Sequence, residues 1–235
     1  VDMTLDTSET YPVREEPKSY DTLMPRLNPP ITIHERLKPV QVIHTPAGET
    51  VLDMGQNMVG WMELSVCAPA GTRIRLQHGE ILQDDNFYTE NLRTAKQEFI
   101  YTCHEGQNLA RAHFTFYGFR YVLVEGWPGE VDPEAFTGCV IHSDMEETGF
   151  IETSNPLVNR LFLNTKWGQK GNFLDTATDC PQRDERMGWT GDAQVFSPTA
   201  MYLEDTYAFY AKYLYDMAKE QSVLDGKVPD VVPSC

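Results

Sequence analysis

The sequence lacks the features that mark several specialised classes of protein. Its five cysteines form no CxxC pair, and an odd number without such a pair is a poor disulfide framework and a poor zinc site. No apolar run approaches the roughly 18–20 residues that a membrane span needs. The N-terminus has neither the basic start nor the apolar centre of a signal peptide, although cytoplasmic and exported locations both remain open. We therefore predict no membrane partner, and free thiols buried as small hydrophobic groups at Cys67, Cys103, Cys139, Cys180 and Cys235.

Basic residues are also scarce. The chain has 19 lysines and arginines against 35 acids, a net charge of −16, which repels a phosphate backbone and excludes a role in nucleic-acid binding. The six histidines show no HxH or HExxH spacing, so we predict no metal site and no cofactor. Serine-nucleophile and phosphate-loop patterns are absent as well. With 41% hydrophobic and 23% charged residues, the 235-residue chain is globular, with one large or two ordinary domains.

The first 150 residues divide into a polar start and a region with the periodicity of strands. Residues 1–30 are polar and rich in proline, as expected for a linker or the tail of an upstream domain. From residue 31 onward, short runs alternate apolar and polar positions, as in TRIRLQ at 72–77, and turn sequences such as PAGT and WPGE separate them. Several short strands at this spacing predict an antiparallel β-sandwich or barrel over residues 31–147.

The periodicity becomes helical near residue 150. Ser154 is a suitable N-cap and Pro156 suits the first turn, so we predict a helix over 155–170. A second helix is predicted over about 195–221, where apolar residues recur at spacings of three and four. This stripe indicates packing in a core and consists of Leu203, Tyr207, Tyr210, Leu214 and Met217.

Between the two predicted helices lies DTATDCPQRDERMGWTGD, residues 175–192, which holds five acids and two arginines. Gly188 and Gly191 flank a Trp-Thr pair, which suits a backbone that approaches a ligand closely. Glu185, Trp189 and Asp192 are spaced i, i+4 and i+7, so a helical turn would place them on one side. An indole can pack against a pyranose ring, carboxylates can accept from its hydroxyls, and crowded carboxylates keep one acid protonated for a leaving oxygen. The alternative is a solvated helix start that Asp179 caps.

The string DCPQRDERMGWTGDAQVF, residues 179–196, resembles the signature of bacterial α-L-rhamnosidases of glycoside hydrolase family 78. Five more segments resemble that family in the same order: DMGQNMVGW, PAGTRIRLQHGEIL, YTENLRTA, FTFYGFRYVLVEGWPG and SNPLVNRLFLNTKWGQKGNFL. The resemblance runs from about residue 30 to the last residue. It implies a multi-domain β + α chain, with an antiparallel β-sandwich at 31–147 followed by the N-terminal helices of an (α/α)6 catalytic barrel at 148–235.

The resemblance also implies roles for the residues of this segment. Glu185 corresponds to the general acid, while Asp179, Arg183, Asp184, Trp189 and Asp192 correspond to residues that contact rhamnose. The family inverts the anomeric configuration with a second glutamate as base, which lies further along than residue 235. We therefore expect this piece to be inactive without the remainder of its parent chain, and its barrel to be incomplete. Leu203, Tyr207 and Leu214 should then partly lack partners.

The expected substrate is a glycoside or oligosaccharide with a terminal non-reducing α-L-rhamnose. Two alternatives stay open: a non-catalytic carbohydrate-binding module, and a barrel glycosidase for another sugar. Trp61 and Trp127 lie in the predicted sandwich, where they serve either as sugar platforms or, more in keeping with their setting, as packing residues. The concentration of acids outside the sandwich favours the enzyme. The sequence leaves the aglycone, the linkage and the oligomeric state undetermined.

Overall fold

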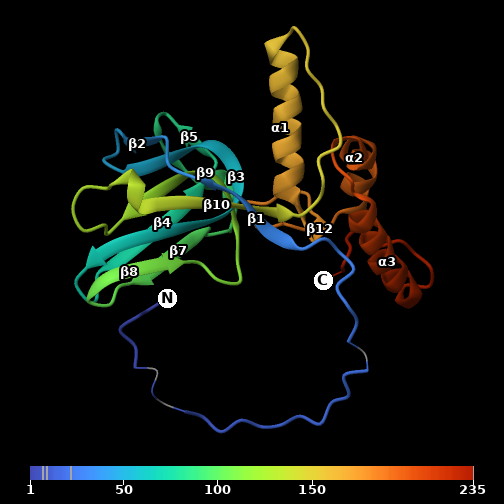
Figure 1. Cartoon of the computed structure of the whole chain (residues 1–235), viewed down its shortest axis with the longest axis horizontal. Coiled ribbons are helices and arrows are strands. Elements are labelled where there is room, and N and C mark those ends of the chain that lie inside the picture. Colours follow the sequence, from blue (N-terminus) through green and yellow to red (C-terminus); the bar gives the residue numbers. More distant parts are fainter. Residues whose placement is uncertain (7, 9, 22, 235) are drawn as a thin grey trace.

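The computed structural model describes residues 1–6, 8, 10–21 and 23–234 and combines a β-sandwich with three helices packed beside it (Figure 1). The helices are α1 (Pro156–Asn172), α2 (Thr190–Leu203) and α3 (Tyr207–Val223), and two single 3-10 turns are η1 (Glu90–Leu92) and η2 (Pro133–Ala135). The strands are β1 (Ile31–Leu37), β2 (Gln41–His44), β3 (Thr50–Ala68), β4 (Arg73–Gly79), β5 (Ile81–Gln83), β6 (Asn86–Tyr88), β7 (Glu98–Thr102), β8 (Gly106–Arg111), β9 (Tyr117–Glu125), β10 (Phe136–Ser143), β11 (Phe173–Leu174) and β12 (Thr176–Ala177).

The long strand β3 connects the two layers of the sandwich. Its first part, residues 50–60, pairs with β2 and β9, and β4 and β7 continue that layer. Its second part, residues 60–68, pairs with β10 and β8, and β1 lies beyond β10. Gly60 stands at the changeover with φ of 153°, and a Cβ there would lie 1.8 Å from the carbonyl oxygen of Cys139. All pairings within this sheet are antiparallel, which confirms the prediction for residues 31–147.

The sandwich encloses the main hydrophobic core. Leu52, Ile74, Leu76, Phe119 and Phe136 are among its fully buried side chains. Burial of this kind stabilises a fold by roughly 1.5–3 kcal/mol for each large side chain. The packing interpretation of the two sandwich tryptophans is confirmed, because both are partly buried against this core.

The cysteine prediction is correct at three positions and wrong at one. Cys103, Cys139 and Cys180 are buried free thiols, whereas Cys67 is exposed. Its place in β3 explains the difference, since the side chains of a strand alternate between faces and its neighbours Val66 and Ala68 take the buried one. Cys235 lies outside the described residues.

The first helix confirms the sequence pattern except at its start. Asn155, not Ser154, is the N-cap of α1, and its side chain accepts a hydrogen bond from the amide of Leu157 at 2.9 Å. Pro156 occupies the first turn as predicted. The helix ends at Asn172, two residues beyond the predicted limit of 170.

The single helix predicted over 195–221 is two helices. The helix breaks at Glu204, whose backbone is extended. The buried carboxylate of Glu204 accepts a hydrogen bond from the side-chain amide of Gln169 in α1 at 2.9 Å. The Asp205 amide bonds to the carbonyl of Glu146 at 2.8 Å. The Asp205 amide thus bonds to a preceding segment, where in a continuous helix it would bond to a carbonyl of its own helix.

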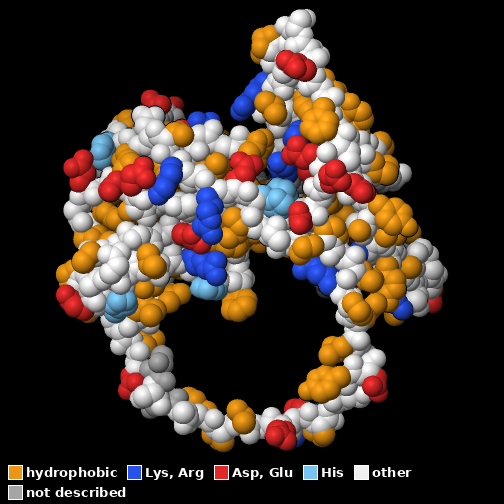
Figure 2. All heavy atoms as spheres, in the orientation of Figure 1, with side chains coloured by type: hydrophobic (Ala, Val, Ile, Leu, Met, Phe, Trp, Pro, Cys, Tyr) orange, Lys and Arg blue, Asp and Glu red, His pale blue; other side chains and the backbone are white. Residues whose placement is uncertain are grey.

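Apolar side chains remain exposed on the helices, and Figure 2 shows them gathered over this part of the surface. Tyr207 is 83% exposed and Leu214 is 59% exposed, as expected for unpartnered faces. The expectation is wrong for Leu203, which is buried and whose carbonyl accepts hydrogen bonds from the amides of Thr148 and Gly149. Among the described residues, no helix has the length and apolarity to cross a membrane.

Candidate functional site

The acidic motif forms a closed loop, not a helix. Residues 178–189 run between β12 and α2, and two hydrogen bonds between Asp179 and Met187 close the loop. The Asp179 amide donates to the carbonyl of Met187 at 3.0 Å, and the Met187 amide donates to Asp179 Oδ1 at 2.9 Å. The alternative of a helix start capped by Asp179 is therefore wrong, and so is the helical spacing argument, because α2 begins only at Thr190.

The sandwich holds this loop in place. Arg186 donates hydrogen bonds to the carbonyl of Phe116 at 3.0 Å and to Gln97 Oε1 at 3.1 Å. Its guanidinium also lies 4.7 Å from the centre of the Phe116 ring. Pro181 packs on β9 at Gly118, where an added Cβ would lie 3.0 Å from the Pro181 ring. The loop is thus fixed on a rigid sheet, as a functional segment requires.

Gly188 makes the close approach that the sequence suggested, but it approaches its own chain. Its carbonyl accepts hydrogen bonds from the Val232 amide and the Tyr213 hydroxyl, both at 2.9 Å. An added Cβ would lie 2.1 Å from the Val232 carbonyl oxygen. At Gly191 an added Cβ would have no neighbour within 4 Å, and this glycine lines a cavity between α1 and α2, so its approach to a ligand stays a prediction.

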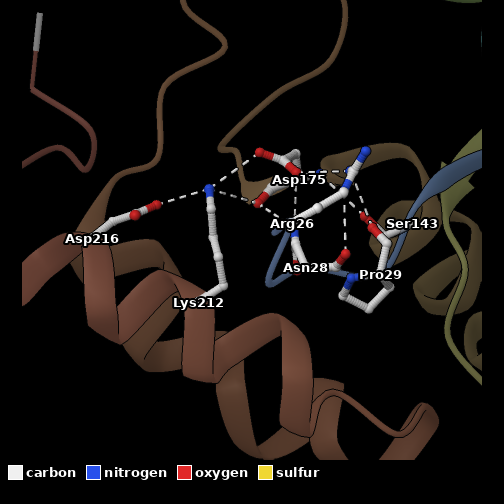
Figure 3. Close-up of polar contacts among 7 residues, drawn as sticks. All are labelled: Arg26, Asn28, Pro29, Ser143, Asp175, Lys212 and Asp216. Carbon is white, nitrogen blue, oxygen red and sulfur yellow. Dashed lines mark hydrogen bonds and ion pairs between the residues drawn. The ribbon is translucent and has the colours of Figure 1, made fainter. Parts of the chain in front are cut away.

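Asp175 joins three parts of the chain just before the loop (Figure 3). Its carboxylate accepts hydrogen bonds from Arg26 at 2.9 Å, from Asn28 at 3.1 Å and from Lys212 of α3 at 3.1 Å. Its amide donates to the Ser143 hydroxyl at the end of β10. Burial alone would raise the pKa of this carboxyl, but the hydrogen bonds from Asn28 and Lys212 hold the pKa below its usual value.

Glu185 lies at the centre of the charged cluster, with its side chain 20% exposed. Its Oε1 accepts a hydrogen bond from the Trp189 indole at 3.0 Å. Its Oε2 forms ion pairs with Arg183 at 2.8 Å and with Arg93 at 3.2 Å. One carboxyl thus has a neutral donor on one oxygen and two guanidinium groups on the other.

Two more acids of the motif lie beside this carboxyl. Asp179 is almost buried, with 6% of its side chain exposed, and lies 3.4 Å from Arg183. Asp184 accepts hydrogen bonds from the hydroxyl of Thr94 and from its amide, the latter at 3.3 Å. The Thr94 hydroxyl is the main reason why the pKa of Asp184 is below its usual value. Arg183 contacts both Asp179 and Glu185 and so links these two acids of the cluster.

Arg93 and Thr94 are the members of this cluster that the sequence analysis did not identify. Both belong to the sandwich region, in the connection between η1 and β7. The signal was present in YTENLRTA, which resembles the family, but nothing local connects these residues to acids about 90 positions later. Their contacts depend on the docking of the loop against the sandwich.

The structure places Asp192 apart from the cluster around Glu185. It lies in the first turn of α2 and lines a cavity of about 650 Å³ between α1 and α2. Asp179 also lines this cavity, together with Phe173 and Phe196, while Glu185 and Trp189 do not. Five of the six predicted residues are thus connected by hydrogen bonds and ion pairs around the loop, and the sixth shares a cavity with one of them.

Within the described residues, Asp179, Cys180 and Glu185 form the one group with three potential metal-ligand atoms, all within 4.8 Å of one another. Arg183 already neutralises both carboxylates at 3.4 and 2.8 Å. Burial raises the pKa of the Cys180 thiol and so disfavours the thiolate that binds metals. This donor set does not suit a cation.

Two family models match the chain. The model of the bacterial alpha-L-rhamnosidase concanavalin-like domain matches residues 43–142, and that of the bacterial alpha-L-rhamnosidase 6 hairpin glycosidase domain matches residues 146–235. The two matches follow one another directly along the chain. The first falls on the sandwich, and the second contains the loop and the three helices.

Several known α-L-rhamnosidases are similar to the chain over most of its length. A curated α-L-rhamnosidase from Streptomyces avermitilis is 43% identical over 216 residues, which are 91% of this chain and 21% of that protein. A crystal structure of the Streptomyces avermitilis enzyme complexed with L-rhamnose has a TM-score of 0.84 at 44% identity. The match covers 89% of this chain and 20% of the chain in that structure. The native α-L-rhamnosidase of Aspergillus terreus has a TM-score of 0.84 at 42% identity, with 88% and 24% covered. The chain thus spans about a fifth to a quarter of the length of these relatives.

Proposed function

Since the chain belongs to the bacterial α-L-rhamnosidases of glycoside hydrolase family 78, we propose that its protein hydrolyses terminal non-reducing α-L-rhamnose residues of rhamnosides with inversion. The observation that carries the proposal is the position of Glu185. Its carboxyl is held by the Trp189 indole and two arginines in a loop fixed against the sandwich. A fixed acid beside an indole, with further carboxylates nearby, can hold a sugar and protonate its leaving oxygen.

In this proposal Glu185 is the general acid. It gives its proton to the glycosidic oxygen as the bond to the anomeric carbon breaks, and a water adds to that carbon from the opposite face. Arg183 and Arg93 both occupy the Oε2 of Glu185, so their side chains must turn away before that oxygen can reach the glycosidic oxygen. Arg183 has a reason to turn, because the resemblance makes it a rhamnose ligand.

The remaining motif residues bind rhamnose in this proposal. Asp179, Arg183, Asp184 and Asp192 hold its hydroxyls, and Trp189 covers the apolar side of the ring. An inverting enzyme also needs a base about 6.5–9.5 Å from its acid, with room for water between them. The resemblance places that base at a glutamate further along than residue 235, and we propose that activity depends on it.

The domain organisation belongs to the same proposal. Residues 1–30 form a linker or the tail of an upstream domain, residues 31–147 the sandwich, and residues 148–235 the N-terminal part of an (α/α)6 catalytic domain. The exposed apolar faces of the helices support this division, since helices of such a barrel pack on further helices. The match to a six-hairpin domain supports it as well.

Two alternatives remain testable. A binding module without catalysis would need no fixed acid, and the charged cluster of this chain lies outside the sandwich core. A barrel glycosidase for another sugar would share the architecture, because a fold does not determine the substrate. The family match and the relative solved with L-rhamnose favour rhamnose.

The variant Glu185→Gln tests the proposal in the protein as its complete gene encodes it. It keeps the shape and hydrogen-bonding capacity of the side chain but removes the proton. Hydrolysis of a rhamnosyl disaccharide should fall by roughly 10²–10⁴-fold, the scale of general acid catalysis. An aryl rhamnoside with an activated leaving group should lose less, because its leaving oxygen needs less protonation.

A matched control is Glu63→Gln, which removes a glutamate that is ion-paired with Arg36 at 2.6 Å on the sandwich. It should leave both rates unchanged. Equal losses on both substrates in Glu185→Gln, with unchanged folding, would make Glu185 a binding residue and not the acid. Hydrolysis of another terminal sugar in preference to rhamnose would support the second alternative.

A further inference from the structure

The side chains around Glu185 form a series of increasing exposure. Asp179 is 6% exposed, Glu185 is 20%, Arg183 is 32% and Arg93 is 54%. A glycosidase that removes terminal sugars holds that sugar at the inner end of its pocket, and the rest of the substrate extends towards solvent. Asp179 therefore marks the inner end of this cluster and Arg93 its outer end, while Arg183 spans from Asp179 to Glu185.

The position of the proton donor locates the aglycone. A general acid must touch the glycosidic oxygen, which lies between the rhamnose and the group that leaves. Asp179 lies on the inner side of Glu185, and Arg93 contacts the same carboxyl from the outer side at 3.2 Å. Arg93 therefore lies next to the part of the aglycone that is attached to the glycosidic oxygen.

Arg93 has hydrogen-bonding capacity to spare. Both of its ion pairs use Nη1, at 3.2 Å from Glu185 and 3.9 Å from Asp184, and its Nε and Nη2 have no partner within the described part of the chain. A guanidinium has five N–H donors in a planar fork, which suits the hydroxyl oxygens of a sugar. An apolar aglycone would offer this group no acceptor.

The backbone holds Arg93 in an unusual conformation. Its φ is 58°, a value that favours glycine, and Gln97 four residues later has φ of 45°. Such conformations persist only where surrounding contacts hold them, and they are frequent at ligand sites. Here the contacts are those of Thr94 with Asp184 and of Gln97 with Arg186. The segment is therefore fixed to the loop that carries Glu185.

We propose that Arg93, a residue of the sandwich region, binds the aglycone and favours rhamnosides whose rhamnose is attached to another sugar. The inference rests on the proposed function, since it takes Glu185 as the acid. Arg93 leaves the Glu185 carboxyl when substrate enters and donates hydrogen bonds to hydroxyls of the adjoining sugar. The sandwich then forms part of the substrate site and is not only a support for the helices.

The test compares two substrates in the protein as its complete gene encodes it: a rhamnosyl-glucose disaccharide and 4-nitrophenyl α-L-rhamnoside. Arg93→Ala should lower kcat/KM for the disaccharide by about tenfold or more relative to the aryl substrate, the scale of a hydrogen bond to a charged group. Inhibition by free L-rhamnose should not change, and Arg93→Lys should restore part of the loss. Arg36→Ala is the matched control, because Arg36 is 53% exposed and also paired with a glutamate.

Each other outcome overturns the inference. Equal losses on both substrates would show a merely structural role, and unchanged kcat/KM on both would show none. Weaker inhibition by L-rhamnose would place Arg93 on the rhamnose and not on the aglycone. If the unmodified protein hydrolyses neither substrate, the proposed function fails together with the inference; if it hydrolyses both, only the inference is at stake.

Discussion

Replacing Asp175 with asparagine isolates the charge of the carboxylate that joins the N-terminal segment, the sandwich and α3 (Figure 3). Asparagine keeps the shape and an oxygen that accepts from Asn28, and it tolerates the φ of 68° found here. The ion pairs with Arg26 and Lys212 lose their negative partner. The aspartate and the asparagine at position 175 therefore differ in charge and in little else.

The size of the effect follows from the exposure of these groups. Asp175 is 42% and Arg26 is 50% exposed, so solvent screens their ion pair, and such pairs contribute about 0–1 kcal/mol. Lys212 is only 18% exposed, but it keeps a second partner in Asp216 at 2.8 Å. Two such pairs together contribute about 0–2 kcal/mol, and we expect Asp175→Asn to lower the free energy of unfolding by about 1 kcal/mol at pH 7.

The loss of stability in Asp175→Asn should disappear at low pH. The pKa of Asp175 in the folded protein is below its usual value, so the carboxylate stabilises the fold above the ordinary pKa of about 3.9. That stabilisation disappears as the pH falls through the folded pKa. The difference between the two proteins should thus be constant from pH 8 to about 5 and vanish in stronger acid.

Urea unfolding followed by tryptophan fluorescence at pH 7, 5 and 3 measures this difference. Asp216→Asn is the control, because it removes the other partner of Lys212 in an i, i+4 pair and should change stability by about 0.5 kcal/mol or less. An unchanged difference at pH 3, or an equal loss in Asp216→Asn, would refute the assignment of the effect to the Asp175 charge.

Two further predictions concern the loop and its cavity. Gly188→Ala should lower activity and thermal stability together, because the new Cβ would lie 2.1 Å from the Val232 carbonyl oxygen. The fold should tolerate Gly191→Ala, and equal melting temperatures in the two variants would contradict this packing argument. Asp192→Asn should weaken inhibition by free L-rhamnose roughly ten- to a hundredfold, the value of one charge-assisted hydrogen bond, and an unchanged inhibition constant would leave Asp192 without a sugar-binding role.

The local regularities of this protein could be predicted from its sequence. The period-two runs identify an antiparallel sheet, because side chains of a strand alternate between core and solvent, and Pro156 marks the first turn of α1. The concentration of acids and arginines at 175–192 also identified the segment that forms the charged cluster. These features depend on residues close together in the chain, which a sequence displays directly.

Contacts between distant segments decided the rest. The predicted second helix breaks at Glu204, where the Asp205 amide bonds to the carbonyl of Glu146 and the Glu204 side chain bonds to Gln169. Glu185 and Trp189 have helical spacing but lie in a loop. The loop forms because Arg186 bonds to the carbonyl of Phe116 and Asp179 bonds to the amide of Met187, in place of helical hydrogen bonds.

The charged cluster shows the same limit most clearly. Arg93 reaches Glu185 across 92 positions, a contact that exists only because the loop docks on the sandwich. The sequence by itself determined which residue types gather in the motif and that the motif lies between two helical regions. Only the tertiary structure decided which charges meet, because ion pairs depend on separations of a few ångströms between side chains that the chain order leaves far apart.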